Sequence, residues 1–239
     1  MQVGNQTRPR VHQNVVAELA RRILSGEIPS GGILASMQDL ADELSVSRSA
    51  LREAIKVLSA KGMVEVRPRI GTRVRPRSGW NLMDPELLSW CGLDFDHHLL
   101  ESLLKCRQLI EPGAAAMAAA NANAGQLAMI ENAFLRMKAA TSLAERLQAD
   151  LDFHVSVLSA SGNIFLEQWG GTISSILLAA FRISTETAPS DDEAFDVHAE
   201  VLDAIRLRNA PRADRAMRRL LTVAAKDLHV AEGAVQKAS

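Results

Sequence analysis

Apolar positions between residues 34 and 75 follow two short helical segments and then a hairpin. Ser36 and Ser47 each stand directly before a segment with helical apolar spacing, where a serine hydroxyl caps the free N–H groups of a helix. Gly62 stands where the second helix would end, and residues 63–75 then predict a strand, a turn and a return strand. Helix, turn, helix and hairpin in this order predict a winged helix-turn-helix.

After residue 80 the apolar positions keep the period of an α-helix, and no stretch alternates in the manner of a strand. Proline and glycine punctuation separates six expected helices, at about 96–121, 125–140, 143–161, 164–186, 192–208 and 212–231. The fold class is therefore mainly α. We expect a winged helix-turn-helix domain over 8–76, a linker and short connecting helix over 77–94, and an all-α helical bundle over 95–232.

The net charge of −1 hides an uneven distribution of charge between these two parts. Residues 1–78 hold 13 lysines and arginines against seven aspartates and glutamates, whereas the rest of the chain holds 14 against 21. A basic N-terminal part, called the head, and an acidic remainder, called the body, favour a nucleic-acid partner that binds the head alone. The sequence shows no signal peptide and no apolar run near 18 residues, so we expect a cytoplasmic protein with no membrane partner.

The second helix of the head carries Arg48, Arg52 and Lys56 at intervals of four residues, on the side opposite its apolar face. Folding does not require such a stripe, whereas the phosphates along a DNA groove attract it. A basic face that is merely solvated is the alternative. We expect the following residues of the helices and the wing to contact DNA: Gln38, Ser47, Arg48, Ser49, Arg52, Arg69, Gly71 and Thr72.

The stretch from about residue 12 to 75 resembles the DNA-binding domain of the GntR family of transcription factors. Residues at many fixed spacings carry the resemblance: Leu34, Leu40, Ala41, Val46, Ser47, Arg48, Leu51, Arg52, Glu53, Ala54, Leu58, Gly62, Gly71, Thr72, Arg73 and Val74. Two positions depart from the family pattern, since Ala35 replaces a usual proline and Arg69 replaces the first glycine of the wing. The added charge of Arg69 suits a minor groove. The resemblance implies that the chain binds double-stranded operator DNA.

The helical part, about residues 95 to 231, resembles the FCD-type ligand-sensing domain of the FadR subfamily. Four segments carry this resemblance: 107–112, 150–154, 161–163 and the surroundings of His198. It implies a bundle of six or seven helices around an effector cavity, and a homodimer. Residues 79–90 are most similar to those of sugar-acid operon repressors of the galactonate type.

Asp150 and His154 are four residues apart, so they share one face of one helix, and His198 on a later helix can converge on them. Two imidazoles and a carboxylate suit zinc, nickel or another divalent ion with open coordination positions. The family resemblance implies a third histidine 22 residues after His198, but Leu220 stands there. The alternative is a site without metal, in which both histidines form hydrogen bonds to the effector.

Arg107 lies on a long apolar helix, where its charge is costly unless it is paired. It either pairs with Glu111, four residues on, or binds an effector carboxylate in the cavity. Arg182 is a weaker candidate for anion binding. Cys91 and Cys106 match no metal or redox spacing and are expected to be reduced core thiols. The remaining histidines of the helical part, His97, His98 and His229, are interpreted as ordinary core or surface residues.

These observations predict a homodimeric transcriptional regulator, most simply a repressor, that responds to a small organic acid. The expected effector site comprises Arg107, Asp150, His154, His198 and Arg182. Two other classes stay open at this point. One is a metal-dependent enzyme built on the bundle. It is disfavoured because the sequence offers no general base or nucleophile at a suitable spacing from these residues. The other is a DNA-binding protein without a ligand, which leaves a polar cluster in an apolar bundle unexplained.

Overall fold

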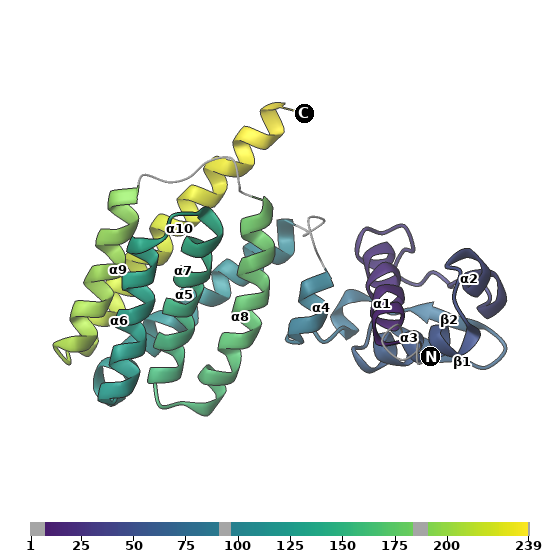
Figure 1. Ribbon diagram of the computed structural model, residues 1–239, viewed down its shortest axis with the longest axis horizontal. Coiled ribbons are helices and arrows are strands. Elements are labelled where there is room, and N and C mark those ends of the chain that lie inside the picture. The colour runs from purple at the N-terminus through teal and green to yellow at the C-terminus, as the bar shows by residue number, and fades with distance from the viewer. Residues whose placement is uncertain (1–7, 91–96, 184–190, 239) are drawn as a thin grey trace, which may run out of the picture. The chain divides into compact units, whose positions relative to one another are not determined.

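The computed structural model describes residues 8–90, 97–183 and 191–238 of the chain (Figure 1). Side chains are described for residues 14–88, 90, 101–174 and 193–225. The chain forms two compact units, residues 1–94 and 95–239. The first unit is called the head below and the second the body.

The head contains the predicted winged helix-turn-helix. Its elements are α1 (Arg8–Leu24), α2 (Met37–Glu43), α3 (Arg48–Ala60), β1 (Val64–Arg67) and β2 (Gly71–Val74). The side chain of Ser36 accepts a hydrogen bond from the backbone N–H of Asp39, and that of Ser47 accepts one from Ala50, so both predicted N-caps are confirmed. The two strands pair antiparallel and form the wing.

One apolar core joins the three helices of the head to the wing. Leu19, Leu51 and Leu58 have no exposed surface, and residues of both strands pack on the same cluster. Gly62 follows α3 with φ +76°, and a Cβ there would lie 2.3 Å from the backbone oxygen of Gly79. Two features therefore require glycine at position 62: the left-handed backbone conformation and the close approach of the Gly79 backbone.

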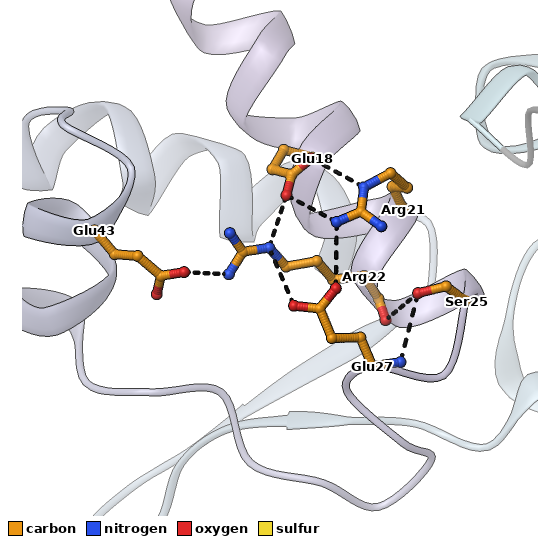
Figure 2. Close-up of polar contacts among 6 residues, drawn as sticks. All are labelled: Glu18, Arg21, Arg22, Ser25, Glu27 and Glu43. Carbon is orange, nitrogen blue, oxygen red and sulfur yellow. Dashed lines mark hydrogen bonds and ion pairs between the residues drawn. The ribbon is translucent and has the colours of Figure 1, made fainter.

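A network of ion pairs ties the end of α1 to α2 (Figure 2). Glu18 accepts hydrogen bonds from Arg21 at 3.0 Å and from Arg22 at 2.8 Å, and Glu27 pairs with both arginines. Arg22 also donates to Glu43 of α2 at 2.6 Å. The network therefore links α1 to α2, the helix that precedes the basic helix α3.

Residues 76–90, where we expected a linker and a short helix, pack on the core of the head. They include the 3-10 turn η1 (Arg77–Gly79) and α4 (Pro85–Trp90). Trp80 and Leu87 belong to the apolar cluster of the head. Lys61 Nζ lies 2.8 Å from carboxylate oxygens of both Asp84 and Glu86. Apolar contacts and charge together hold this segment against α1 and the end of α3.

The body is an all-α bundle, as predicted (Figure 1). Its helices are α5 (His97–Asn121), α6 (Ala124–Ala139), α7 (Leu143–Ala160), α8 (Ile164–Ile183), α9 (Asp191–Arg206) and α10 (Ala210–Ala238). Helix α5 packs on α10, α7 and α9, and α7 also packs on α6 and α8. Alanines fill the core where α5 meets its neighbours, because small side chains let helix axes approach closely.

Two expectations about single segments are corrected. The last helix runs seven residues beyond its expected end at 231, to Ala238. Cys106 is exposed rather than a core thiol, because it lies on an outward face of α5; Cys91 lies outside the described residues. No helix within the described residues combines the length and apolarity that a membrane span requires.

Candidate DNA-binding surface and effector site

Helix α3 presents a buried apolar face and an exposed basic face. Leu51, Ile55 and Leu58 lie in the core, whereas Arg48 and Arg52 are exposed. Lys56, the third cation of the stripe, is also exposed but pairs with Glu53 at 2.8 Å. The predicted division of the helix into two faces is therefore confirmed, and its basic face is open to a groove.

Neighbouring side chains form hydrogen bonds with Arg48, and none of the ion pairs in the described residues involves Arg52. The guanidinium of Arg48 donates to the side-chain oxygen of Gln38 on α2, and Gln38 in turn donates to Asp42 at 2.6 Å. Among the described residues Arg52 has no ion-pair partner. Ser47 and Ser49 are exposed beside it, with their hydroxyl oxygens 2.9 Å apart. Arg52 is thus the cation of α3 that needs the least rearrangement to reach a base or a phosphate.

The wing places Arg69 and Gly71 at its exposed tip. Arg69 has φ +64°, a left-handed conformation that suits glycine, which fits the glycine that the family resemblance implies at this position. Thr72 differs from the other predicted contact residues, because its side chain is only 9% exposed. Its backbone oxygen accepts a hydrogen bond from Leu34. Thr72 therefore shapes the wing, and its side chain does not face solvent.

In the body, the structure brings Asp150, His154 and His198 together. One ligand atom from each lies within 4.8 Å of the others. Asp150 and His154 are one turn apart on α7, and His198 comes from α9, as the spacing predicted. His154 and His198 are buried, while 19% of the Asp150 side chain is exposed. The ring of Phe153 lies edge-on to both imidazoles, at centroid distances of 5.9 and 5.0 Å, and forms an apolar wall.

A hydrogen bond to the main chain fixes which nitrogen of His198 carries a proton. Nδ1 of His198 lies 2.6 Å from the backbone oxygen of Ala194, which can only accept, so this nitrogen donates. Nε2 of His198 is buried and has no hydrogen-bond partner in the described residues, although it lies 2.9 Å from Oδ1 of Asp150. When His198 is neutral, these are two acceptors facing each other. Such a pair is stable only with a proton or a cation between its atoms.

Glu111 on α5 completes the buried polar group. Its carboxylate accepts a hydrogen bond from Nε of Arg107 at 2.5 Å, and its Oε2 lies 2.6 Å from Nδ1 of His154. Arg107, Glu111 and His154 are 3%, 1% and 2% exposed. Of the two possibilities left open for Arg107, the structure therefore shows the pair with Glu111. The contact between Glu111 and His154 spans 43 residues and was not predicted; an acid beside Arg107 on an apolar helix was the only indication in the sequence.

The charges in this group lower the pKa of both carboxyl groups. Burial alone would raise the pKa of Glu111, but the charges of Arg107 and His154 lower it to about 2. Burial also opposes ionisation of Asp150, yet contacts with His198, His154 and Arg107 hold its pKa well below the ordinary value. Both groups are therefore carboxylates at neutral pH. Arg107 acts electrostatically on Asp150 even though its guanidinium is bonded to Glu111.

The donor set fits a divalent metal ion. Asp150 supplies an oxygen, and His154 and His198 each keep Nε2 available because Nδ1 is already bonded. Imidazole nitrogen and carboxylate oxygen are ligands that zinc and nickel accept. Leu220, where a third histidine would stand, is 2% exposed and belongs to the same apolar core as Phe153. The protein thus offers three ligands from this group.

The other predicted residues of the body lie outside this description. Arg182 belongs to α8, but its side chain is not among those described. The same holds for the side chains of His97, His98 and His229. Of the residues expected at an effector site, the structure therefore describes Arg107, Asp150, His154 and His198, and it adds Glu111 to their polar group.

Two family models match this chain. The model for bacterial regulatory proteins of the gntR family matches residues 11–74, and the FCD domain matches residues 102–223. The first match covers the three helices and the wing of the head, and the second covers the helices that carry the polar group of the body. GntR regulators bind operator DNA, and FCD domains bind small-molecule effectors.

Curated relatives share both parts of the chain. The HTH-type transcriptional regulator YieP of Escherichia coli is 37% identical over 87% of this chain and 91% of its own length. The galactonate operon transcriptional repressor of Escherichia coli is 32% identical over 84% of this chain and 90% of its own length. The HTH-type regulator LutR of Bacillus subtilis is 32% identical over 84% of this chain and 93% of its own length.

A solved structure supports the fold. The Lar regulator of the Listeria monocytogenes agr system aligns with a TM-score of 0.69 over 96% of this chain and 99% of its own, at 17% identity. Since the relatives are transcriptional regulators, the family excludes the metal-dependent enzyme that the sequence had left open. With a winged helix-turn-helix head and an FCD body, this chain belongs to the GntR family of transcriptional regulators, in its FadR-type subfamily.

Proposed function

We propose that this regulator is a homodimeric repressor of a catabolic operon, and that a small hydroxylated carboxylate such as a sugar acid releases it from DNA. The observation that carries the proposal is the buried polar group of the body, in which Nε2 of His198 and Oδ1 of Asp150 face each other at 2.9 Å. A polar ligand or a cation that binds beside them can satisfy these groups, and the apolar residues around them cannot. A relative that is 32% identical represses a galactonate operon, which supports a sugar acid as the ligand.

The chemistry of the group favours an anion with hydroxyl groups over a fatty acyl chain. Two imidazoles lie beside Asp150, and the positive charge of Arg107 acts on the same carboxylate. A divalent ion, zinc or nickel, held by Asp150, His154 and His198 would supply a positive centre with coordination positions open to ligand oxygens. Carboxylate and hydroxyl oxygens are suitable ligands for such positions, whereas an alkyl chain offers no donor atom.

We infer a dimer from the geometry of DNA recognition. A single head reaches one half-site, and specific operators commonly repeat the half-site about a two-fold axis. We infer that the interface comes mostly from the body. Light scattering at micromolar concentration should give twice the mass of one chain, and a mass of 25.9 kDa with and without operator would contradict the dimer.

The effector proposal is tested by thermal unfolding and by release from operator DNA. A panel of aldonic acids should include one that raises the melting temperature, because a ligand that binds only the folded state stabilises it by about 2.7 kcal/mol at 100 times its Kd. The same acid should displace the protein from operator in a gel-shift assay. A shift with a long-chain acyl thioester and none with aldonic acids would refute the proposal.

A pair of substitutions on α7 makes this test specific. Asp150→Asn removes the carboxylate of the polar group and should abolish the shift. Asp152→Asn is the matched control, because Asp152 lies on the same helix but pairs with Arg136 on the surface at 2.7 Å. Both variants should keep operator affinity in the absence of ligand. Loss of the shift in both, or in neither, would mean that the effector does not bind at this group.

A further inference from the structure

We propose that Glu111, itself held by Arg107, is a positioning residue that fixes His154 as the Nδ1–H tautomer and aims its Nε2 at the site shared with Asp150 and His198. The effect on metal affinity rests on the proposed function, whereas the effect on the tautomer does not. Neither Glu111 nor Arg107 then acts by touching the effector directly.

The first step of the argument is the geometry of the contact. A carboxylate only accepts hydrogen bonds, so the nitrogen 2.6 Å from Glu111 Oε2 must carry the proton. That nitrogen is Nδ1 of His154, so in the neutral imidazole the lone pair lies on Nε2. A carboxylate behind a histidine ligand also makes the imidazole a stronger donor to a cation.

The second step concerns the orientation of Glu111. Its two oxygens would otherwise be free to rotate, but Arg107 donates from Nε at 2.5 Å to Oε1 and from Nη2 at 3.4 Å to Oε2. Both residues lie on α5, one turn apart, so the pair is built into a single helix. With Glu111 at 1% exposure, water does not compete for these contacts.

The third step is the parallel with His198. There a backbone oxygen, that of Ala194, takes the role that Glu111 plays for His154, and it leaves Nε2 as the nitrogen that faces Asp150. The ring centroids of the two histidines are 5.8 Å apart. Both imidazoles thus reach the site in the same tautomer, one set by the main chain and the other by the Arg107–Glu111 pair.

The consequence for Arg107 is a change of role. Two of its nitrogens are bonded to Glu111, so its charge is used first to hold that carboxylate in place. A variant of Arg107 should therefore lose metal affinity through the orientation of His154. This explains why a buried arginine stands on α5 without requiring that it clamp the effector.

The test uses the full-length protein with histidine rings labelled with ¹⁵N and with zinc alone as the probe. In the wild type without metal, His154 should show the ¹⁵N shifts of the Nδ1–H tautomer, assigned by comparison with His154→Gln. The double variant Arg107→Met/Glu111→Gln removes both charges together and so avoids leaving one buried charge unpaired. In this variant the His154 shifts should move toward a mixture of tautomers, and zinc affinity should fall 10- to 100-fold.

The matched control is Glu101→Gln/Lys105→Met, which removes a surface pair at the same spacing on the same helix. It should change neither the ¹⁵N shifts nor the zinc affinity. Circular dichroism and thermal unfolding establish that both double variants are folded; if Arg107→Met/Glu111→Gln fails to fold, Glu111→Gln alone is measured in the same way.

The outcomes separate the positioning role from the proposed function. Unchanged His154 shifts and unchanged zinc affinity in a folded Glu111 variant would overturn the inference, and so would an Nε2–H tautomer in the wild type. If the wild type binds no zinc or nickel, the metal part of the proposed function fails. The ¹⁵N shifts of the metal-free proteins still decide whether Glu111 sets the tautomer.

Discussion

The backbone conformation of Arg69, at the tip of the wing, lowers the stability of the fold. We expect the side chain of Arg69 to contribute to DNA binding in return. Its φ of +64° is a left-handed conformation that costs a residue with a Cβ roughly 1–2 kcal/mol. Arg69→Gly removes this strain, but glycine also raises the entropy of the unfolded chain by roughly 0.5–1 kcal/mol. The net expectation is a gain of about 0.5 kcal/mol in the free energy of unfolding. For a unit of this size that is about 2–4 °C in melting temperature.

The same substitution should weaken operator binding. Each phosphate that a protein no longer neutralises reduces the slope of log affinity against log salt concentration by about 0.9. Arg69→Ala separates the two effects, because alanine removes the charge but keeps the Cβ. It should show the reduced salt slope without the gain in stability, and Ser45→Gly, at φ 53°, should show a gain in stability without a change in slope.

Chemical unfolding and fluorescence anisotropy at several salt concentrations measure the two quantities. If Arg69→Gly is destabilised by more than about 1 kcal/mol, the strain argument is wrong. If its salt slope equals that of the wild type, Arg69 does not bind a phosphate, and the wing binds by other residues.

Three further predictions concern the head and the body. Arg52→Ala should weaken operator binding by about 1–3 kcal/mol in a gel-shift assay, and unchanged affinity would remove Arg52 from the reading surface. Leu220→His should tighten zinc or nickel binding in competition titrations, since it adds an imidazole, and no gain would mean that this position does not reach the site. The side chains of Arg21 and Arg22 lower the pKa of Glu18 from 4.5 to about 2, so the stability this group adds is present above pH 4.5 and is lost as the pH falls toward 2. Urea unfolding at pH 5 and pH 3 measures how far the free energy of unfolding falls between the two. In Glu18→Gln this fall should be smaller than in the wild type, by less than about 1 kcal/mol. An equal fall in both proteins would show that the network adds no stability.

Much of the architecture follows from local rules. Ser36 and Ser47 cap their helices through hydrogen bonds that span three residues, and the apolar period of α3 selects its buried face, so sequence spacing is enough to predict both. The pairing of Asp150 with His154 on one face also depends only on helical geometry.

Other features depend on contacts that sequence spacing does not contain. Glu111 contacts His154 because α5 and α7 pack with these two faces toward each other. If either helix were rotated about its own axis, the two side chains would separate. Thr72 reads as a wing residue open to DNA, yet it lies on the same face of β2 as Val74, which is buried in the core of the head. Cys106 shows the reverse error: without a metal or redox spacing it was expected to be a core thiol, but it is exposed on α5.

The packing of residues 76–90 on the head bears on how regulators of this kind exchange parts during evolution. A recombination event that joined a foreign sensor directly after the wing would remove Trp80 and Leu87 from the apolar core of the head and would strip Lys61 of both its acidic partners. A junction placed after residue 94 would transfer the whole compact unit. Natural hybrids that reuse this head should therefore carry the segment through α4 with it, and sequence similarity to the head should persist past the wing in chains whose sensors are unrelated.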